Sequence, residues 1–243
     1  MLKVLLTVPV RNEEVVLEKN IRTLFSFCEK NLADYDWQIQ IVDNGSTDRT
    51  APIAQAFARG SEKISFLHLP ESGRGKALSS AWTAALGSYD ILAYMDADLS
   101  ADLSVLPVFL WAIRKGAGVA YGSRFESSSS VTRSLLREVS SRVYRFLARR
   151  ILGIRARDLQ CGFKAVSSSA WSVLRERVNH PGWFWDTELL FWAERLKMKV
   201  VAVPVDWVEA RDQRRKSTVR LFRTALGYLR DIVRLKLKLL RKL

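Results

Sequence analysis

The segment Met95-Asp-Ala-Asp-Leu99 places two carboxylates, Asp96 and Asp98, one residue apart at the end of an apolar run. Carboxylate oxygens in this position suit a divalent cation that also binds a diphosphate, because Mg²⁺ and Mn²⁺ prefer oxygen ligands. Such a cation would neutralise charge on a diphosphate leaving group. An Asp-x-Asp pair on its own is a weak signal, since a solvated turn or a helix cap has the same residues.

Three more polar segments follow apolar runs or open helical patterns in the first half of the chain. They are Val8-Pro-Val-Arg-Asn-Glu13, Ile41-Val-Asp-Asn-Gly-Ser-Thr-Asp48 and Gly73-Arg-Gly-Lys-Ala77. The glycines of the third segment would let backbone approach a phosphate or ribose, and Lys76 would add positive charge. Taken alone, this segment is equally compatible with a flexible turn.

Arginines that suit a phosphate mark the second half, in Gly122-Ser-Arg124 and in Arg137-x-x-x-Ser141-Arg142. A guanidinium fork matches phosphate oxygens in geometry and charge. These arginines therefore favour a phosphate ligand, with a solvated helix face as the alternative.

The elements that must position these residues alternate between short apolar runs and helical patterns. Few-residue loops between them predict an α/β fold with a mostly parallel sheet and helices on both faces. Ligands of such sheets bind beyond the carboxyl ends of the strands, where the polar segments lie. The expected strands are Val4–Val10, Gln38–Asp43, Ile64–Leu69, Ile91–Asp96 and Gly118–Gly122, and the expected helices are Glu13–Asn31, Thr47–Arg59, Lys76–Leu86 and Leu103–Lys115.

Beyond residue 125 the pattern is a polar loop at Ser127–Ser130, then helices at Leu135–Leu152 and Trp183–Lys197 and a strand at Val200–Val208. From Thr218 onward, apolar residues recur at i, i+3, i+4 spacing with Arg and Lys between them. This pattern fits a terminal helix packed on its own domain, a basic interfacial helix, or both. We expect a catalytic domain at 1–217 and a basic amphipathic helix at 218–243.

Charge is concentrated at the C-terminal end. The chain has 243 residues and a net charge of +14, and twelve Lys or Arg against two Asp from Arg211 to Leu243 leave +10 there. A polyanionic partner is expected, which could be a nucleic acid, an anionic lipid surface or a phosphorylated substrate. The long apolar stripe and the absence of a nucleic-acid module in the sequence favour the membrane. Two cysteines and no apolar run long enough to span a bilayer indicate a cytoplasmic, peripheral protein.

In order along the chain, these motifs resemble the family 2 glycosyltransferases of GT-A fold, which have a Rossmann-like sheet. The set is Pro9-x-x-Asn12-Glu13, Val42-Asp43-Asn-Gly45-Ser46, Gly73–Lys76, Asp96-x-Asp98 and Gly122-Ser-Arg124. The resemblance implies that Asp43 contacts the nucleobase, that Asp96 faces the sugar or ribose, and that Asp98 holds Mg²⁺ or Mn²⁺. Pro9, Asn12, Glu13, Gly73 and Lys76 would complete the nucleotide-sugar site. Arg11 departs from the aromatic residue that is usual in relatives.

Asp158-Leu-Gln-Cys-Gly-Phe-Lys164 and the arginine segments are similar to the polyprenyl-phosphate sugar synthases, among them the dolichyl-phosphate glucosyltransferase and mannose synthase types. This resemblance implies that Arg124, Arg137 and Ser141 bind the lipid phosphate. It also implies that Asp158 and Gln160–Lys164 shape the catalytic sugar site. UDP-glucose is the favoured donor, with GDP-mannose close behind, and a dolichyl or other polyprenyl phosphate is the acceptor.

An acceptor phosphate is already an anionic nucleophile at neutral pH, because its second pKa is about 6. Single displacement with inversion at the sugar C1 then requires positioning and electrostatics but no general base. If Asp158 acts as a base, a hydroxyl acceptor is favoured instead. The alternative function is therefore a family 2 transferase that acts on a glycan hydroxyl or another soluble acceptor.

Overall fold

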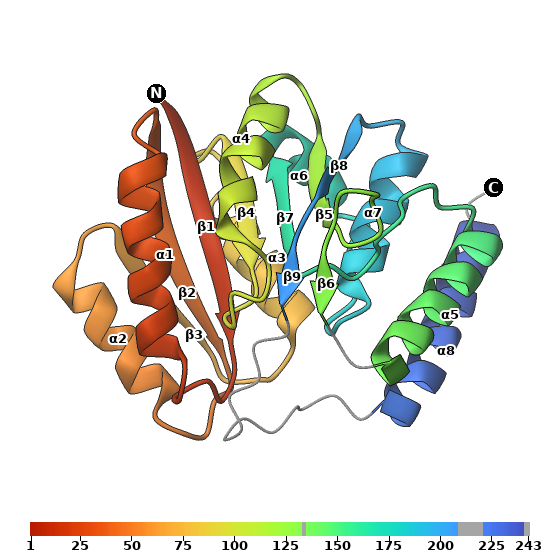
Figure 1. The fold of residues 1–243 in the computed structure, drawn as a ribbon, viewed down its shortest axis with the longest axis horizontal. Coiled ribbons are helices and arrows are strands. Elements are labelled where there is room, and N and C mark those ends of the chain that lie inside the picture. The colour runs from red at the N-terminus through yellow and green to blue at the C-terminus, as the bar shows by residue number, and fades with distance from the viewer. Residues whose placement is uncertain (133–134, 209–220, 241–243) are drawn as a thin grey trace.

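The computed structural model describes residues 1–132, 135–208 and 221–240, and these contain one seven-stranded sheet (Figure 1). Its strand order is β3-β2-β1-β4-β7-β5-β8, and every neighbouring pair is parallel except those that β7 makes with β4 and β5. The predicted α/β class with a mostly parallel sheet is confirmed. The strands are β1 (Leu2–Val10), β2 (Tyr35–Asn44), β3 (Ile64–Leu69), β4 (Ile91–Met95), β5 (Val119–Ser123), β7 (Phe163–Ser167) and β8 (Val200–Pro204).

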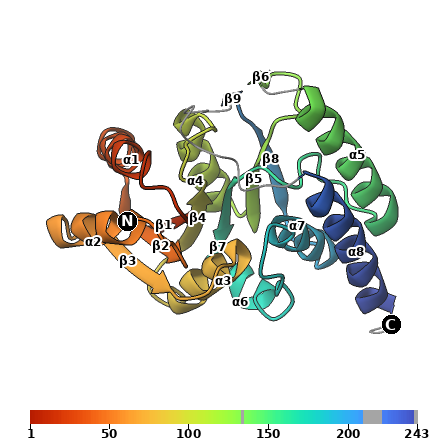
Figure 2. The same cartoon turned by 90° about the horizontal axis from the view of Figure 1, so that it is seen from below.

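Helices cover both faces of the sheet, and each face has its own apolar core. Apolar side chains of α1, α2 and α4 pack on one face, and those of α3 and α5 to α8 pack on the other. Figure 2 shows α1 and α4 on the side opposite α3 and α6. The helices are α1 (Leu17–Asn31), α2 (Thr50–Gly60), α3 (Arg74–Ala84), α4 (Leu106–Arg114), α5 (Leu135–Leu152), α6 (Ser168–Leu174), α7 (Trp185–Arg195) and α8 (Leu221–Leu240), with a short 3-10 helix η1 (Leu103–Val105).

The elements predicted in the first 125 residues are present with bounds that differ by up to four residues, whereas α6 was not predicted. The first helix begins at Leu17 and not at Glu13, because Asn12 has a φ of 55° and the Glu13 carbonyl closes the entering turn. The predicted strand Val200–Val208 is interrupted after Pro204. Its second part, β9 (Trp207–Val208), pairs with β6 (Val131–Thr132) in a separate two-stranded sheet.

Strand β7 was not predicted, and it determines what lies at the functional edge. It pairs antiparallel with β4 and β5, with Phe163 opposite Met95 and Lys164 opposite both Tyr94 and Tyr121. Because β7 runs against its neighbours, its amino end meets the carboxyl ends of β4 and β5. The residues before Phe163 therefore come to the same edge as the Asp-x-Asp segment.

Helix α8 packs on the body of the protein beside α5 (Figure 1). The ring centroids of Tyr144 and Tyr228 lie 4.8 Å apart, and Ile232 and Leu235 are buried in the core. The proposed boundary after residue 217 lies outside the described residues, as do Lys216 and Ser217. None of the described helices is long and apolar enough to span a membrane.

Candidate active site

The carboxyl ends of β2, β1, β4 and β5 lie at one edge of the sheet, together with the amino end of β7. Asp43 is the second-last residue of β2, and Asp96 follows β4 directly. Pro9 lies near the end of β1, beyond the last residue that β4 pairs with, so its missing N–H falls outside that ladder. The fold therefore brings most of the predicted site residues to one edge.

The loops after β1 and β2 are joined by side-chain hydrogen bonds. Asn12 Oδ1 accepts from the Thr47 N–H at 2.8 Å, and the Glu13 N–H donates to Thr50 Oγ1 at 2.7 Å. Asp43 is fully buried, and its Oδ2 lies 2.8 Å from His68 Nδ1. These bonds join the loops after β1 and β2 and connect Asp43 to β3, where a nucleobase is expected.

Asn44 connects this group to the glycine-rich segment. Its Nδ2 donates to the Val10 carbonyl at 2.8 Å, and its Oδ1 accepts from the Gly73 N–H at 3.1 Å. Gly73 precedes the first residue of α3, and the Lys76 ammonium pairs with Glu71 at the surface. That pairing lowers the pKa of Glu71. The predicted phosphate segment is thus fixed to the end of β1 through one amide side chain.

Asp96 is held by a guanidinium that the sequence analysis did not single out. Arg74 donates to Asp96 Oδ1 from Nε at 3.0 Å and from Nη2 at 2.7 Å. Its Nη1 donates to Asp186 Oδ2 at 2.6 Å. The other oxygen of Asp186 accepts from Lys164 Nζ at 2.7 Å and from the Tyr94 hydroxyl. Two cations and two carboxylates therefore form one network with balanced charge.

Burial and charge shift the two carboxylates of this network in opposite directions. Burial raises the pKa of Asp96 above its ordinary value, and the neighbouring Asp98 charge adds to the rise, although Arg74 opposes it. Burial also acts to raise the pKa of Asp186, but Lys164 and Arg74 outweigh it and hold that pKa below its ordinary value. The network therefore favours the charged form of Asp186, which anchors Arg74 and Lys164.

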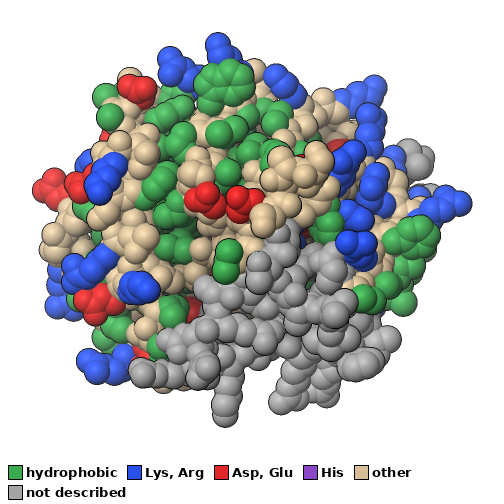
Figure 3. Space-filling view, in the orientation of Figure 1, with side chains coloured by type: hydrophobic (Ala, Val, Ile, Leu, Met, Phe, Trp, Pro, Cys, Tyr) green, Lys and Arg blue, Asp and Glu red, His purple; other side chains and the backbone are tan. Residues whose placement is uncertain are grey.

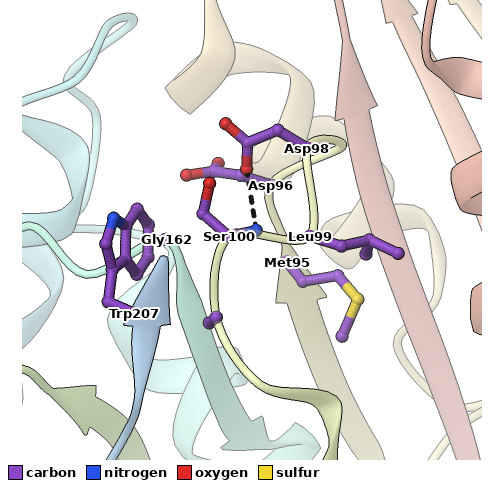
Figure 4. A pocket seen from close by; sticks show the side chains of 8 residues that line it. Met95, Asp96, Asp98, Leu99, Ser100, Gly162 and Trp207 are labelled. Atoms are coloured by element: carbon purple, nitrogen blue, oxygen red, sulfur yellow. Dashed lines mark hydrogen bonds between the residues drawn. The ribbon is translucent and has the colours of Figure 1, made fainter. Parts of the chain in front are cut away.

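Asp96 and Asp98 line a pocket together with Ser100, Gly162 and Trp207 (Figure 4). Asp98 Oδ1 accepts from the Ser100 N–H at 3.1 Å, and Leu99 between them has a positive φ of 49°. Among the described residues no group of three or more His, Cys, Asp or Glu could hold a metal ion. Two carboxylates in an open pocket still fit Mg²⁺, which commonly uses one or two carboxylates and takes its other ligands from water and substrate phosphates.

Gly162 determines the position of Asp96 from the other side. The Asp96 N–H donates to the Gly162 carbonyl at 3.0 Å, and a Cβ added at Gly162 would lie 1.7 Å from Asp96 Oδ2. Asp96 therefore occupies the space that any side chain at 162 would need. This contact accounts for a glycine immediately before β7.

Asp158 is buried and forms a two-point ion pair with Arg124. Its Oδ2 accepts from Arg124 Nε at 2.7 Å and its Oδ1 from Nη2 at 2.9 Å, while the Arg124 N–H donates to Oδ2 at 3.0 Å. Burial acts to raise the pKa of Asp158, but Arg124 and Lys164 outweigh it and lower that pKa. The Arg124 guanidinium also lies 4.7 Å from the centroid of the Trp207 ring, which lines the Asp96–Asp98 pocket.

The other two predicted phosphate ligands lie on α5. Ser141 is half-buried in its second turn. Arg137 belongs to the first turn of the helix, and its side chain lies outside the described residues. Gln160 belongs to the segment before β7, where its N–H donates to Asp158 Oδ1 at 3.2 Å.

The residues that sequence reasoning missed share one property, which is that their partners are distant in sequence. Arg74 and Asp186 are 112 residues apart. Lys164 was predicted to shape the sugar site, but its buried bond to Asp186 was not, because it lies on a strand that was not predicted. Two signals were available in the sequence, which are the arginine between Gly73 and Gly75 and the lysine in the apolar run from Phe163. A charged side chain that is buried at either position requires a partner of opposite charge. Trp185 is buried in the core, whereas Trp183 is exposed and Trp207 lines the pocket.

Comparisons with known proteins identify the family of the chain. The family model described as Glycosyl transferase family 2 matches residues 6–174. Glycosyltransferase AglD of Haloferax volcanii is 36% identical over 96% of this chain and 36% of that protein. Dolichyl-phosphate beta-glucosyltransferase of Drosophila melanogaster is 31% identical over 83% of this chain and 66% of that protein. The chain thus spans about a third of the first relative and about two thirds of the second.

A solved structure of glucosyl-3-phosphoglycerate synthase from Mycobacterium tuberculosis, in complex with UDP, has the same fold. Its TM-score is 0.71 at 20% identity, over 97% of this chain and 80% of that one. The fold supports the GT-A prediction, and the family model spans the chain from β1 to α6, including the Asp-x-Asp segment. The chain belongs to glycosyl transferase family 2.

Proposed function

We propose that the chain transfers glucose from UDP-glucose to the phosphate of a polyprenyl lipid such as dolichyl phosphate, with inversion at the sugar C1. Relatives named dolichyl-phosphate beta-glucosyltransferase support the sugar and the acceptor class. The observation that carries the proposal is the ion pair of Asp158 with Arg124. A carboxylate whose pKa is lowered by a buried guanidinium is a poor base, so the acceptor must bring its own charge.

The donor is expected to lie along the edge from β2 to β4. Asp43 takes the base, with Pro9, Asn12 and Glu13 beside it, and Gly73 and Lys76 face the diphosphate. Asp96 faces the ribose or sugar, where Arg74 and Gly162 fix its carboxylate. A fixed carboxylate needs no reorganisation during the reaction, which is the basis of electrostatic preorganisation.

Asp98, with Asp96 beside it, is expected to hold Mg²⁺ or Mn²⁺. Structures of the related mycobacterial synthase with UDP contain Mn²⁺ or Mg²⁺, which supports this assignment. A cation bound there supplies positive charge beside the leaving diphosphate. Asp98 is then a ligand of the metal ion. The Lys76 ammonium would add a second positive charge, and it must break its ion pair with Glu71 to reach the phosphates.

The acceptor phosphate is expected beside Trp207, between Arg124 and the first turns of α5. Arg124 donates two hydrogen bonds to Asp158, which fix the position of its guanidinium. Arg137 and Ser141 are the residues of α5 that are expected to bind the acceptor phosphate. We expect Arg137→Ala to raise the KM for the lipid phosphate tenfold to a hundredfold, about 1.5–3 kcal/mol, with UDP affinity unchanged.

A lipid surface fits the outer faces of α5 and α8. Exposed apolar residues recur on α5 at Val139, Val143 and Phe146, and on α8 at Leu229, Val233 and Leu237. In Figure 3, Lys and Arg side chains gather with apolar ones at the right-hand end of the molecule, where α5 lies in Figure 1. Apolar stripes flanked by basic residues suit the headgroup region of an anionic leaflet. We therefore place the enzyme peripherally at the cytoplasmic membrane face.

A matrix of two donors and two acceptors tests this function. UDP-glucose and GDP-mannose are each offered with a short polyprenyl phosphate in micelles and with a glycan that has only hydroxyl acceptors, in Mg²⁺ or Mn²⁺. We expect glucose transfer to the lipid phosphate alone. Transfer to the glycan hydroxyl with no lipid product would establish the alternative function instead.

A further inference from the structure

The turn between α6 and α7 lies directly on the start of α3. A Cβ at Gly75 would lie 2.2 Å from the His180 carbonyl oxygen, and one at Gly73 would lie 2.9 Å from the Pro181 carbonyl oxygen. The Lys76 N–H donates to that same Pro181 carbonyl at 3.1 Å. The two glycines thus make room for this turn, which in turn fixes the backbone of Gly73–Lys76.

Helix α8 holds the turn from the opposite side. His180 Nδ1 accepts from the Gly182 N–H at 3.1 Å, so the ring proton lies on Nε2 and is donated to Asp231 Oδ2 of α8, at 3.2 Å. Glu188 Oε2 accepts from the N–H groups of Asn179 and His180, both at 2.7 Å, and its other oxygen lies 3.9 Å from Lys238 Nζ of α8. Two residues of α8 therefore contact the groups that shape the turn.

Asp231 is the single acidic residue in the sequence of α8, and it faces inward while Leu229, Val233 and Leu237 face outward. Arg230 and Arg234 approach the same carboxylate within 4.0 Å from the helix itself, and those arginines are mostly exposed. Outside its own helix, Asp231 contacts His180. A carboxylate is seldom buried without a partner, so its presence on the inner face of this basic helix indicates a specific contact there.

We infer that Asp231 and His180 are positioning residues for the donor diphosphate, because they connect α8 to the backbone of Gly73–Lys76 through the 179–182 turn. The inference rests on the proposed function in one respect, which is that the donor phosphates bind at Gly73–Lys76. It goes beyond that function in giving the C-terminal helix a part in donor binding in addition to lipid contact. The helix that meets the membrane with its outer face would then brace the donor site with its inner face.

Two measurements on the full chain test the inference. Hydrogen–deuterium exchange reports the Lys76 amide, whose bond to Pro181 depends on the turn. Titration calorimetry with UDP and Mg²⁺ reports donor affinity. Asp231→Ala and His180→Ala should each speed exchange at Lys76 and weaken UDP binding about tenfold, equivalent to ~1.4 kcal/mol. The double variant should be no worse than His180→Ala alone, because His180→Ala already removes the contact with Asp231.

Two further variants separate positioning from general destabilisation. Asp231→Asn keeps an oxygen that accepts from His180 Nε2, so it should retain nearly wild-type UDP affinity. Glu18→Ala removes an exposed ion pair with Arg22 on α1 and should change neither measurement. If Asp231→Ala does not fold, His180→Ala tests the same contact from the other side.

The inference is overturned if folded Asp231→Ala and His180→Ala exchange at Lys76 as slowly as the wild type. Additive effects of the two substitutions would equally contradict a shared contact. A wild-type chain that does not bind UDP would overturn the proposed donor instead, and exchange at Lys76 would still decide whether α8 positions this segment.

Discussion

Gly162→Ala perturbs the position of Asp96 with a single methyl group. The new Cβ would lie 1.7 Å from Asp96 Oδ2, whereas real Cβ contacts are essentially never closer than 3.0 Å, so the carboxylate must move by about 1.3 Å. That movement opposes the two hydrogen bonds of 2.7 and 3.0 Å from Arg74. Overpacking of this kind costs about 1–3 kcal/mol of stability. A displacement of about 1 Å at a reacting centre can cost about a hundredfold in rate.

We therefore expect Gly162→Ala to fold, to melt at a lower temperature, and to lose about a hundredfold in kcat for glucose transfer from UDP-glucose. Circular dichroism checks the fold, and steady-state release of UDP gives kcat. Gly60→Ala is the matched control, because a Cβ there meets nothing within 4 Å. A Gly162→Ala enzyme with wild-type kcat would refute the reasoning, since Asp96 would then tolerate displacement.

Three further predictions concern the metal, the acid limb of stability and the C-terminal helix. Asp98→Ala should abolish turnover with little change in melting temperature, and full activity of this variant in EDTA would exclude the metal role. Asp158→Asn should lower the free energy of unfolding at pH 7 by about 3–5 kcal/mol, because Arg124 loses its charged partner. Because folding lowers the pKa of Asp158, its charged form stabilises the fold above about pH 4, and this stabilisation is lost as the pH falls further. Urea unfolding should therefore show that the difference in free energy of unfolding between the wild type and Asp158→Asn shrinks in acid. A difference that stays constant would contradict this. Gly227→Ala in α8 should raise the free energy of unfolding by about 0.5–1 kcal/mol in the same assay, because a Cβ there meets nothing within 4 Å; a decrease would mean that α8 needs the glycine.

The parallel half of the sheet was predictable because each of its strands is a short apolar run that ends at a polar segment. β3 has the bounds expected from the sequence, and so does α5. Their periodicities are strong and their boundaries are marked by charged or small residues. Asp43, Asp96 and Asp98 were predicted as site residues by the same reasoning, since they stand at the ends of such runs.

Strand β7 could not be predicted in this way. Phe163–Ser167 is five residues long and contains Lys164, and its direction depends on neighbours at Tyr94 and Tyr121 that are far away in sequence. The buried network that fixes Asp96 has the same origin. Arg74, Lys164 and Asp186 are each costly to bury alone and become stable only when the fold brings them together.

The chemical structure of the lipid product is the most direct test of the proposed function. UDP-glucose with the sugar carbon isotopically labelled is incubated with a polyprenyl phosphate, Mg²⁺ and the wild-type chain, and the product is examined by mass spectrometry and NMR. The proposed function predicts one glucose per lipid, joined through phosphate with the β configuration, and none from Asp98→Ala. Glucose joined to a hydroxyl, an α linkage, or equal labelling by the Asp98→Ala variant would contradict it.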